Sequence, residues 1–293
     1  MSRLDHVALI GFGEVGQILA VDLAMAGVTD IAAWDILFDQ PDSPPSRAAK
    51  GCAVRVASSA PDCVRDAALV ISAVTAARDL AAAASVGLGL PPGAFYLDLN
   101  SCSPSQKRAS AELVEAAGGR YVEAAVMSPF PPRRIASPML LGGPHAQAFL
   151  EASAGLGFTG ASVFSATIGQ AAAAKLCRSV VVKGIEALLA ESLLAARSYG
   201  VEQTVLNSLS DLLPIPDWRA TAQYMISRSL EHGVRRAEEM EEAVRTVAEA
   251  HVVPAMSRAT VERQAWAAQF RAVLGAGGLE AMLDAINSQS EAS

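Results

Sequence analysis

Three glycines near the N-terminus have the spacing needed to bind a phosphate group. Gly11, Gly13 and Gly16 form the pattern G-x-G-x-x-G directly after an apolar run typical of a β-strand. The first glycine can take a sharp turn, the second lets a pyrophosphate approach the backbone, and the third lets a helix pack closely on the strand. The N-terminus of that helix offers free N–H groups and a partial positive charge. We therefore expect a dinucleotide to contact Gly11, Phe12, Gly13, Glu14, Val15 and Gly16.

A carboxylate ends the next strand-like segment, residues 30–35. A Rossmann fold places an acidic residue here to bind the adenosine ribose, so Asp35 is a second cofactor candidate. Its charge favours NAD because it would repel the 2′-phosphate of NADP. Arg47 follows in a loop rich in proline and serine and cannot be placed from sequence, so NADP is not excluded. The alternative is a glycine turn that only joins strand to helix, with Asp35 a solvated acid.

The elements that must position these residues alternate along the N-terminal part. Apolar runs predict parallel strands at 69–74 and 94–99, and further strands at 121–126 and 138–142 close this half. Ser59 and Ser103 each stand before a helical pattern with an early proline, as is typical of helix starts. Strands that alternate with helices predict a mostly parallel, doubly wound sheet. We expect this dinucleotide-binding domain to span residues 1–166.

The character of the sequence changes beyond about residue 164, where β-type segments vanish. Residues 170–199 hold no proline and one glycine, and Gly200 follows where a helix C-terminus places glycine. This pattern predicts one long helix joining the two domains. Further helical patterns predict an all-α second domain over residues 167–293, and they cover residues 203–213, 218–250, 254–274 and 279–286.

Composition restricts the class of protein. The net charge of −7 argues against nucleic acid or an anionic membrane as a partner. The four cysteines have neither C-x-x-C spacing nor histidine-rich neighbours, which indicates reduced thiols and no metal site. A core strand begins within a few residues of Met1, so we expect no signal peptide and a cytoplasmic location. The most apolar later stretch, residues 176–196, carries four charged residues and is no membrane span.

Four segments of the chain resemble the β-hydroxyacid dehydrogenase family, which includes 3-hydroxyisobutyrate dehydrogenase and the 6-phosphogluconate dehydrogenases. The resemblance is clear to about Gly200 and weak beyond. The segments are Gly11-Phe12-Gly13-Glu14-Val15-Gly16, Val70-Ile71-Ser72-Ala73-Val74-Thr75, Asp98-Leu99-Asn100-Ser101-Cys102-Ser103-Pro104, and Gly169-Gln170 with Lys175.

The resemblance implies a role for each of these segments. Residues like Ala73, Val74 and Thr75 touch the cofactor, and the loop like Asn100-Ser101 borders nicotinamide and substrate. We therefore expect Asn100 to bind the cofactor and Ser101 the substrate.

Lys175 is the catalytic residue that the resemblance implies. It would face the substrate hydroxyl, act as general base during oxidation, and act as general acid in the reverse reduction. A lysine partly desolvated beside a positively charged nicotinamide is more readily neutral, and a neutral amine can accept the alcohol proton. From sequence alone, a lysine after four alanines is more often a solvated or snorkelling side chain.

The chain departs from the family at the substrate. An asparagine that usually follows the lysine by four residues is Ser179 here. The family's Ser-Gly-Gly, which holds the substrate carboxylate, corresponds to Met127-Ser128-Pro129, and Pro129 has no N–H to donate. Ser128 keeps a hydroxyl. Arg133 of the following Arg133-Arg134 pair could bind the anion instead, the alternative being two solvated loop arginines.

One histidine of the C-terminal domain is a further candidate. His232 falls roughly where family members place a lysine that reaches the active site, often from a partner subunit. The alternative is an ordinary histidine on the helix surface.

The sequence thus predicts an oxidoreductase that uses NAD to oxidise a small β-hydroxy acid. The alternatives are an NADPH-dependent imine or keto-acid reductase, or a nucleotide-binding sensor without turnover. The apolar, alanine-rich C-terminal half predicts a homodimer or a larger homo-oligomer.

Overall fold

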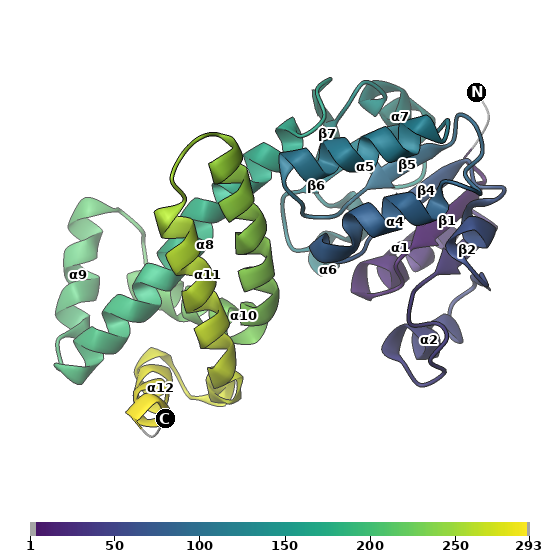
Figure 1. Ribbon diagram of the computed structural model, residues 1–293. Helices are drawn as coiled ribbons and strands as arrows, with labels where there is room; N and C mark the ends of the chain where they lie inside the picture. The colour runs from purple at the N-terminus through teal and green to yellow at the C-terminus, as the bar shows by residue number, and fades with distance from the viewer. Residues whose placement is uncertain (1–3, 292–293) are drawn as a thin grey trace. The chain divides into compact units, whose positions relative to one another are not determined.

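The computed structural model of the chain describes residues 4–291, apart from the side chains of residues 211, 212 and 291. The chain forms two compact units, Met1–Lys175 and Leu176–Ser293. Strands and helices alternate in the first unit, whereas the second consists of helices (Figure 1). The predicted fold class, a Rossmann domain followed by an all-α domain with a long helix at the junction, is confirmed.

The strands of the first unit form one sheet, with eight strands among the described residues. Their order is β3-β2-β1-β4-β5-β6-β7-β8. All neighbours pair in parallel except β6 and β7, which are antiparallel. The strands are β1 His6–Ile10, β2 Asp30–Trp34, β3 Arg55–Val56, β4 Leu69–Ser72, β5 Phe95–Asp98, β6 Arg120–Val126, β7 Met139–Gly142 and β8 Ala161–Ser165.

The direction in which successive strands are added to the sheet reverses at β1. Strands β2 and β3 lie on one side of β1, and β4 and the later strands lie on the other. In open α/β sheets this switch point, at the carboxyl ends of the strands, is where ligands bind. The predicted glycine turn follows β1, and the predicted cofactor segment 73–75 follows β4. The topology therefore brings two sequence-predicted segments to the same place.

The edge strand β8 lies outside the strands expected from sequence. The strand, Ala161–Ser165, is short and mostly exposed, and among the described residues it pairs with β7 alone. Three of its five side chains are alanine or serine, so the apolar pattern that identifies a buried strand is absent. Its pairing partner, rather than its own sequence, makes it a strand.

Helices cover both faces of the sheet. One apolar cluster joins one sheet face to α1 and α7, and the other joins the opposite face to α3, α4 and α5. In Figure 1, α4 and α5 lie side by side over their face. The helices of this unit are α1 Glu14–Met25, α2 Pro44–Ala49, α3 Ala60–Val64, η1 Ala76–Arg78, α4 Asp79–Val86, α5 Pro104–Ala116, α6 Phe130–Arg133, η2 Arg134–Ala136 and α7 Ala146–Ala152.

Helix α8, Gln170–Ser198, begins in the first unit and continues into the second. Its bounds agree with the predicted long helix, and Gly200 ends it with a φ of 67°. This left-handed conformation suits glycine and is common just after a helix C-terminus.

The second unit packs its helices around one main apolar cluster. Helix α10 is bent at His232, whose φ of −123° is not helical. Beside the bend, a Cβ on Gly233 would lie 2.4 Å from the carbonyl oxygen of Gln264, so glycine lets α10 and α11 approach closely. The helices beyond α8 are α9 Glu202–Leu212, α10 Trp218–Glu249, α11 Ala255–Ala267, η3 Ala268–Gly275 and α12 Leu279–Glu291.

Neither a membrane-crossing helix nor a cluster of metal ligands is found among the described residues. None of the helices in 4–291 combines the length and apolar character that crossing a membrane requires. The same residues hold no group of three or more His, Cys, Asp or Glu side chains arranged to bind a metal ion.

Candidate active site

The glycine turn has the geometry that its spacing predicts. Gly11 has a φ of 93°, and a Cβ on it would lie 2.4 Å from the carbonyl oxygen of Ala73. A Cβ on Gly16 would lie 2.3 Å from the carbonyl oxygen of Gly11, so this glycine lets α1 pack on the turn. A Cβ on Gly13 would meet nothing within 4 Å. The second glycine therefore borders open space, where a pyrophosphate can approach the backbone.

The first turn of α1 presents backbone rather than side chains to that space. Gly13 is the N-cap and supplies no side-chain acceptor, so the first N–H groups of the helix remain available to a phosphate. Phe12 is fully buried and its ring packs 5.9 Å from that of Phe38, while Val15 packs against the same core. Glu14 is exposed. These residues fit a dinucleotide through their peptide groups.

Asp35 is held beside the turn. Its Oδ2 accepts a hydrogen bond from the N–H of Phe12 at 2.8 Å, and its Oδ1 accepts one from the N–H of Leu37 at 2.9 Å. The side chain is half-buried. The carboxylate is thus fixed at the end of β2, where a ribose hydroxyl can donate to it.

Asn100 links the carboxyl ends of β4 and β5. Its Oδ1 accepts from the N–H of Val74 at 2.7 Å, and its Nδ2 donates to Ser72 Oγ at 3.0 Å and to Asp79 Oδ1 at 2.7 Å. The side chain is buried, so it acts on the neighbouring loop rather than reaching outward. Asn100 fixes the segment that contains Ala73, Val74 and the exposed Thr75.

A buried ionic cluster, Asp79, Asp98 and Lys107, underlies these loops. Lys107 Nζ lies 2.7 Å from Asp98 Oδ1, and Tyr121 donates to Asp98 Oδ2 at 2.6 Å. Burial raises the pKa of Asp98 to about 7, although the charge of Lys107 opposes the shift. Burial also raises the pKa of Asp79, but Lys107 and hydrogen bonds from groups such as Ser110 outweigh it, so the pKa is lowered overall.

Lys175 and Ser101 meet directly. Lys175 Nζ donates a hydrogen bond to Ser101 Oγ at 2.5 Å, and both side chains are partly exposed. Ser101 stands on the loop after β5, at the same sheet edge as the glycine turn. The structure therefore brings the predicted catalytic lysine to a predicted substrate residue. Both belong to the first unit.

Glu123 is a residue that the sequence analysis missed. It is fully buried in β6, and its carboxylate accepts hydrogen bonds from the N–H groups of Gly169 at 2.6 Å and Ala172 at 2.5 Å. The sequence carries one signal for it, an acidic residue inside the apolar strand 121–126. The two N–H groups that donate to Glu123 lie more than 40 residues further along the chain, so the local sequence pattern could not identify them.

The loop that replaces the family's glycine pair is well anchored. Ser128 Oγ donates to the carbonyl oxygen of Pro129 at 3.1 Å. Arg134 has a φ of 54°, and its guanidinium lies 2.7 Å from Asp22 Oδ1 on α1. Arg133 is exposed. Of the two arginines, Arg134 is engaged by Asp22, which leaves Arg133 as the one that faces solvent.

The two remaining candidates lie in the second unit. Ser179 is buried, and its Oγ accepts from Lys183 Nζ at 3.3 Å. His232 is partly buried at the bend of α10, with its Nε2 2.6 Å from Arg228 Nη1. Burial and then the charge of Arg228 lower the pKa of His232, so the neutral ring, which accepts from arginine, is favoured.

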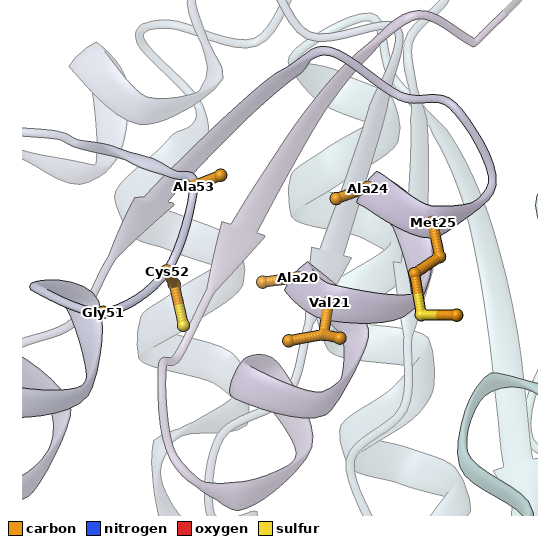
Figure 2. Close-up of a pocket in the computed structure, with 7 residues that line it drawn as sticks. All are labelled: Ala20, Val21, Ala24, Met25, Gly51, Cys52 and Ala53. Atoms are coloured by element: carbon orange, nitrogen blue, oxygen red, sulfur yellow. The ribbon is translucent and has the colours of Figure 1, made fainter.

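A separate apolar hollow lies along the later part of α1 (Figure 2). The helix begins at the glycine turn, so its later residues lie away from the carboxyl ends of the strands. Cys52 contributes the one thiol, and no charged side chain lines the hollow, so it lacks the groups that acid–base chemistry needs. Its lining residues are Ala20, Val21, Ala24, Met25, Gly51, Cys52 and Ala53.

Comparison with known proteins identifies a nucleotide-binding family for the N-terminal part of the chain. Residues 6–169 match the family described as the NAD binding domain of 6-phosphogluconate dehydrogenase. Residues 196–267 match a domain of unknown function, DUF1932. No curated protein matches the chain.

Solved structures resemble the whole chain. A conserved hypothetical protein from Sinorhizobium meliloti 1021 is 33% identical, with a TM-score of 0.77 over 98% of this chain and 97% of that one. Conserved protein MTH1747, described as similar in structure to 3-hydroxyacid dehydrogenases, is 30% identical, with a TM-score of 0.72 over 93% and 100%. Mycobacterium tuberculosis 3-hydroxyisobutyrate dehydrogenase, solved with L-serine, is 19% identical, with a TM-score of 0.71 over 96% and 98%.

The class of protein follows from the fold, the glycine turn and the family match: the chain is an NAD(P)-dependent oxidoreductase with a Rossmann domain. Within that class, the chain belongs to the β-hydroxyacid dehydrogenase family, as its resemblance predicted.

Proposed function

We propose that this protein transfers a hydride between NAD(P) and the hydroxyl carbon of a small β-hydroxy acid, with Lys175 as general acid/base. The observation that carries the proposal is the hydrogen bond from Lys175 Nζ to Ser101 Oγ at 2.5 Å. It supports the proposal because an amine can transfer protons, and this one lies beside the loop that follows β5, at the sheet edge of the glycine turn.

The role of Lys175 follows from the chemistry of an alcohol. NAD(P), which the glycine turn and Asp35 would hold, would supply the acceptor for the hydride that leaves the hydroxyl carbon. Oxidation also releases the hydroxyl proton, and a neutral Lys175 amine can take it. In the reverse direction the Lys175 ammonium returns the proton. Ser101, already within hydrogen-bond distance of Nζ, can orient both the amine and the substrate hydroxyl.

Substrate binding is proposed for five side chains. Ser101 and Ser128 offer hydroxyl groups, and the exposed Arg133 offers a guanidinium that suits a carboxylate. Ser179 and His232, which lie in the second unit, are further candidates that the family resemblance implies. Ser179 is shorter than the asparagine that the family usually has there, which favours a substrate group that reaches further toward it.

NAD is the proposed preference over NADP. Asp35 is fixed by the N–H groups of Phe12 and Leu37, so its negative charge cannot easily move away from an added 2′-phosphate. An ordinary adenosine ribose instead offers hydroxyl donors to the same oxygens.

We also propose that the enzyme works in the cytoplasm as a homodimer or larger homo-oligomer. All four cysteines are free thiols, which suits a reducing compartment. Large apolar side chains are exposed on α8 and α10, which favours association with a second copy.

The test is a cofactor titration followed by turnover of hydroxy acids, measured at the nicotinamide absorbance. The set comprises aldonates, hydroxyisobutyrate and phenylserine-like acids. We expect Lys175→Ala to lower kcat by about 10²- to 10⁴-fold while it still binds NAD. Lys50→Ala, which removes an exposed lysine of the same unit, is the matched control and should retain full activity.

Two other outcomes would replace the proposal. Turnover of imines or keto acids with NADPH, unaffected by Lys175→Ala, would identify a reductase. Tight NAD binding without turnover of any substrate would identify a nucleotide sensor.

A further inference from the structure

A buried carboxylate caps the start of α8, the helix that carries Lys175. Glu123 Oε2 accepts from the N–H of Gly169, directly before α8, and its Oε1 accepts from the N–H of Ala172 in the first helical turn. These N–H groups have no partner within the helix. A negative charge at this end also complements the helix dipole. The carboxylate is therefore the cap of α8, although it comes from a strand rather than from the preceding loop.

Two glycines make room for this cap. Gly142 lies opposite Glu123 in the β6–β7 pairing, and a Cβ on it would lie 2.6 Å from Glu123 Oε2. Gly169 has a φ of 95°, which other residues adopt only with strain and which directs its N–H at the carboxylate. The site is thus shaped around the carboxylate on both sides, from β7 and from the residue that starts α8.

The position of Lys175 depends on this start. Lys175 follows Ala172 by three residues, so the two lie on the same side of the helix, one turn apart. Its Nζ reaches Ser101 on the β5 loop. The amine is therefore placed by two neighbouring strands: β6 fixes the helix start through Glu123, and the loop after β5 receives the side chain.

We infer that Glu123 is a positioning residue for Lys175, holding the first turn of α8 so that the amine stays within reach of the substrate hydroxyl. The inference rests on the proposed function of Lys175. A carboxylate suits this role because both its oxygens accept hydrogen bonds, whereas a glutamine would turn its NH₂ group toward one of the two N–H donors. One contact would be lost and the helix start would shift.

Two variants test the inference by different routes. Glu123→Gln removes the charge and one acceptor, and Gly142→Ala keeps the carboxylate but displaces it. Asp217→Asn is the matched control, because Asp217 caps α10 through the N–H of Ala220 at 2.9 Å, in the other unit. We expect Glu123→Gln and Gly142→Ala each to lower kcat by roughly 10- to 100-fold, with an unchanged Kd for NAD. Asp217→Asn should leave kcat unchanged.

Amide hydrogen exchange of the full protein supplies a readout independent of turnover. Faster exchange in residues 169–175 is expected in Glu123→Gln and Gly142→Ala, and unchanged exchange is expected in Asp217→Asn. If Glu123→Gln fails to fold, as judged by circular dichroism, Gly142→Ala decides the question.

Failure of this inference differs from failure of the proposed function. Wild-type kcat in the Glu123 and Gly142 variants, with turnover lost in Lys175→Ala, would overturn the positioning role alone. A lowered kcat without faster exchange in residues 169–175 would overturn it as well. Full turnover in Lys175→Ala would instead overturn the proposed function and, with it, this inference.

Discussion

At the scale of single residues, the feature that costs the most desolvation is the cluster of two carboxylates and one ammonium beneath the loops of the candidate active site. Asp79, Asp98 and Lys107 are all buried. Burying a charge is costly unless an opposite charge and hydrogen bonds compensate it. Here Lys107 is the one cation of the cluster, and its pKa is raised by Asp98 and Asp79 despite burial. The cluster holds the loops that carry Asn100 and Ser101.

Lys107→Met should therefore be strongly destabilising. It leaves two buried carboxylates without their cation, and losing one partner of a buried pair typically costs about 3–5 kcal/mol. Without Lys107 the pKa values of both carboxylates rise in the folded state. A raised carboxyl pKa favours folding at low pH, and this contribution is lost as pH increases through it. Urea unfolding should thus show that Lys107→Met loses more unfolding free energy, relative to wild type, at pH 8 than at pH 5. A variant within about 0.5 kcal/mol of wild type at both pH values would contradict this account.

A second residue-scale prediction concerns Asp35. Asp35→Ser keeps a small polar group at the end of β2 but removes the charge that opposes a 2′-phosphate. We expect NAD to bind more weakly and NADP more tightly, so that their affinity ratio moves toward NADP by about tenfold or more, which corresponds to about 1.4 kcal/mol. Fluorescence titration with both cofactors measures the ratio. An unchanged ratio would show that Asp35 does not discriminate between them.

At the scale of elements, we expect two glycines of the turn from β1 to α1 to have different roles. Gly16 is expected to serve packing, and Gly13 is expected to serve cofactor binding. Gly16→Ala places a methyl group against the backbone of Gly11, so we expect a loss of about 1–3 kcal/mol in stability. Gly13→Ala meets no protein atom, and its φ of −72° suits alanine. It should keep the melting temperature of the free protein but weaken NAD binding. Thermal unfolding without and with NAD distinguishes the two. Equal melting temperatures for the two variants without NAD would contradict the different roles assigned to Gly16 and Gly13.

The same elements show what sequence can and cannot predict. The glycine turn, the strands that carry the site and the bounds of α8 follow from patterns that lie within a few residues of one another. Glu123 and Lys107 differ, because each is defined by a partner brought in by the fold. From sequence, Lys107 is one polar residue in an amphipathic helix, and nothing marks it as buried. The bend at His232 is equally hidden, since it accompanies the close approach of Gly233 to α11.

At the scale of the whole molecule, the outer side of α8 leads to a prediction about assembly. Val181 and Leu188 are 61% and 57% exposed and lie two helical turns apart on the same side. Between them, a Cβ added to Gly184 would meet nothing within 4 Å among the described residues beyond the local backbone of its own helix, so another backbone can come close. We expect a sedimentation mass of two chains or a larger multiple at micromolar concentration.

Leu188→Glu should yield single chains, because association would bury an unpaired charge. Val253→Glu is the control: Val253 is 78% exposed but lies off this helix, so assembly should persist. A wild-type mass of one chain would refute the homo-oligomer, and an assembled Leu188→Glu variant would place the interface on another surface.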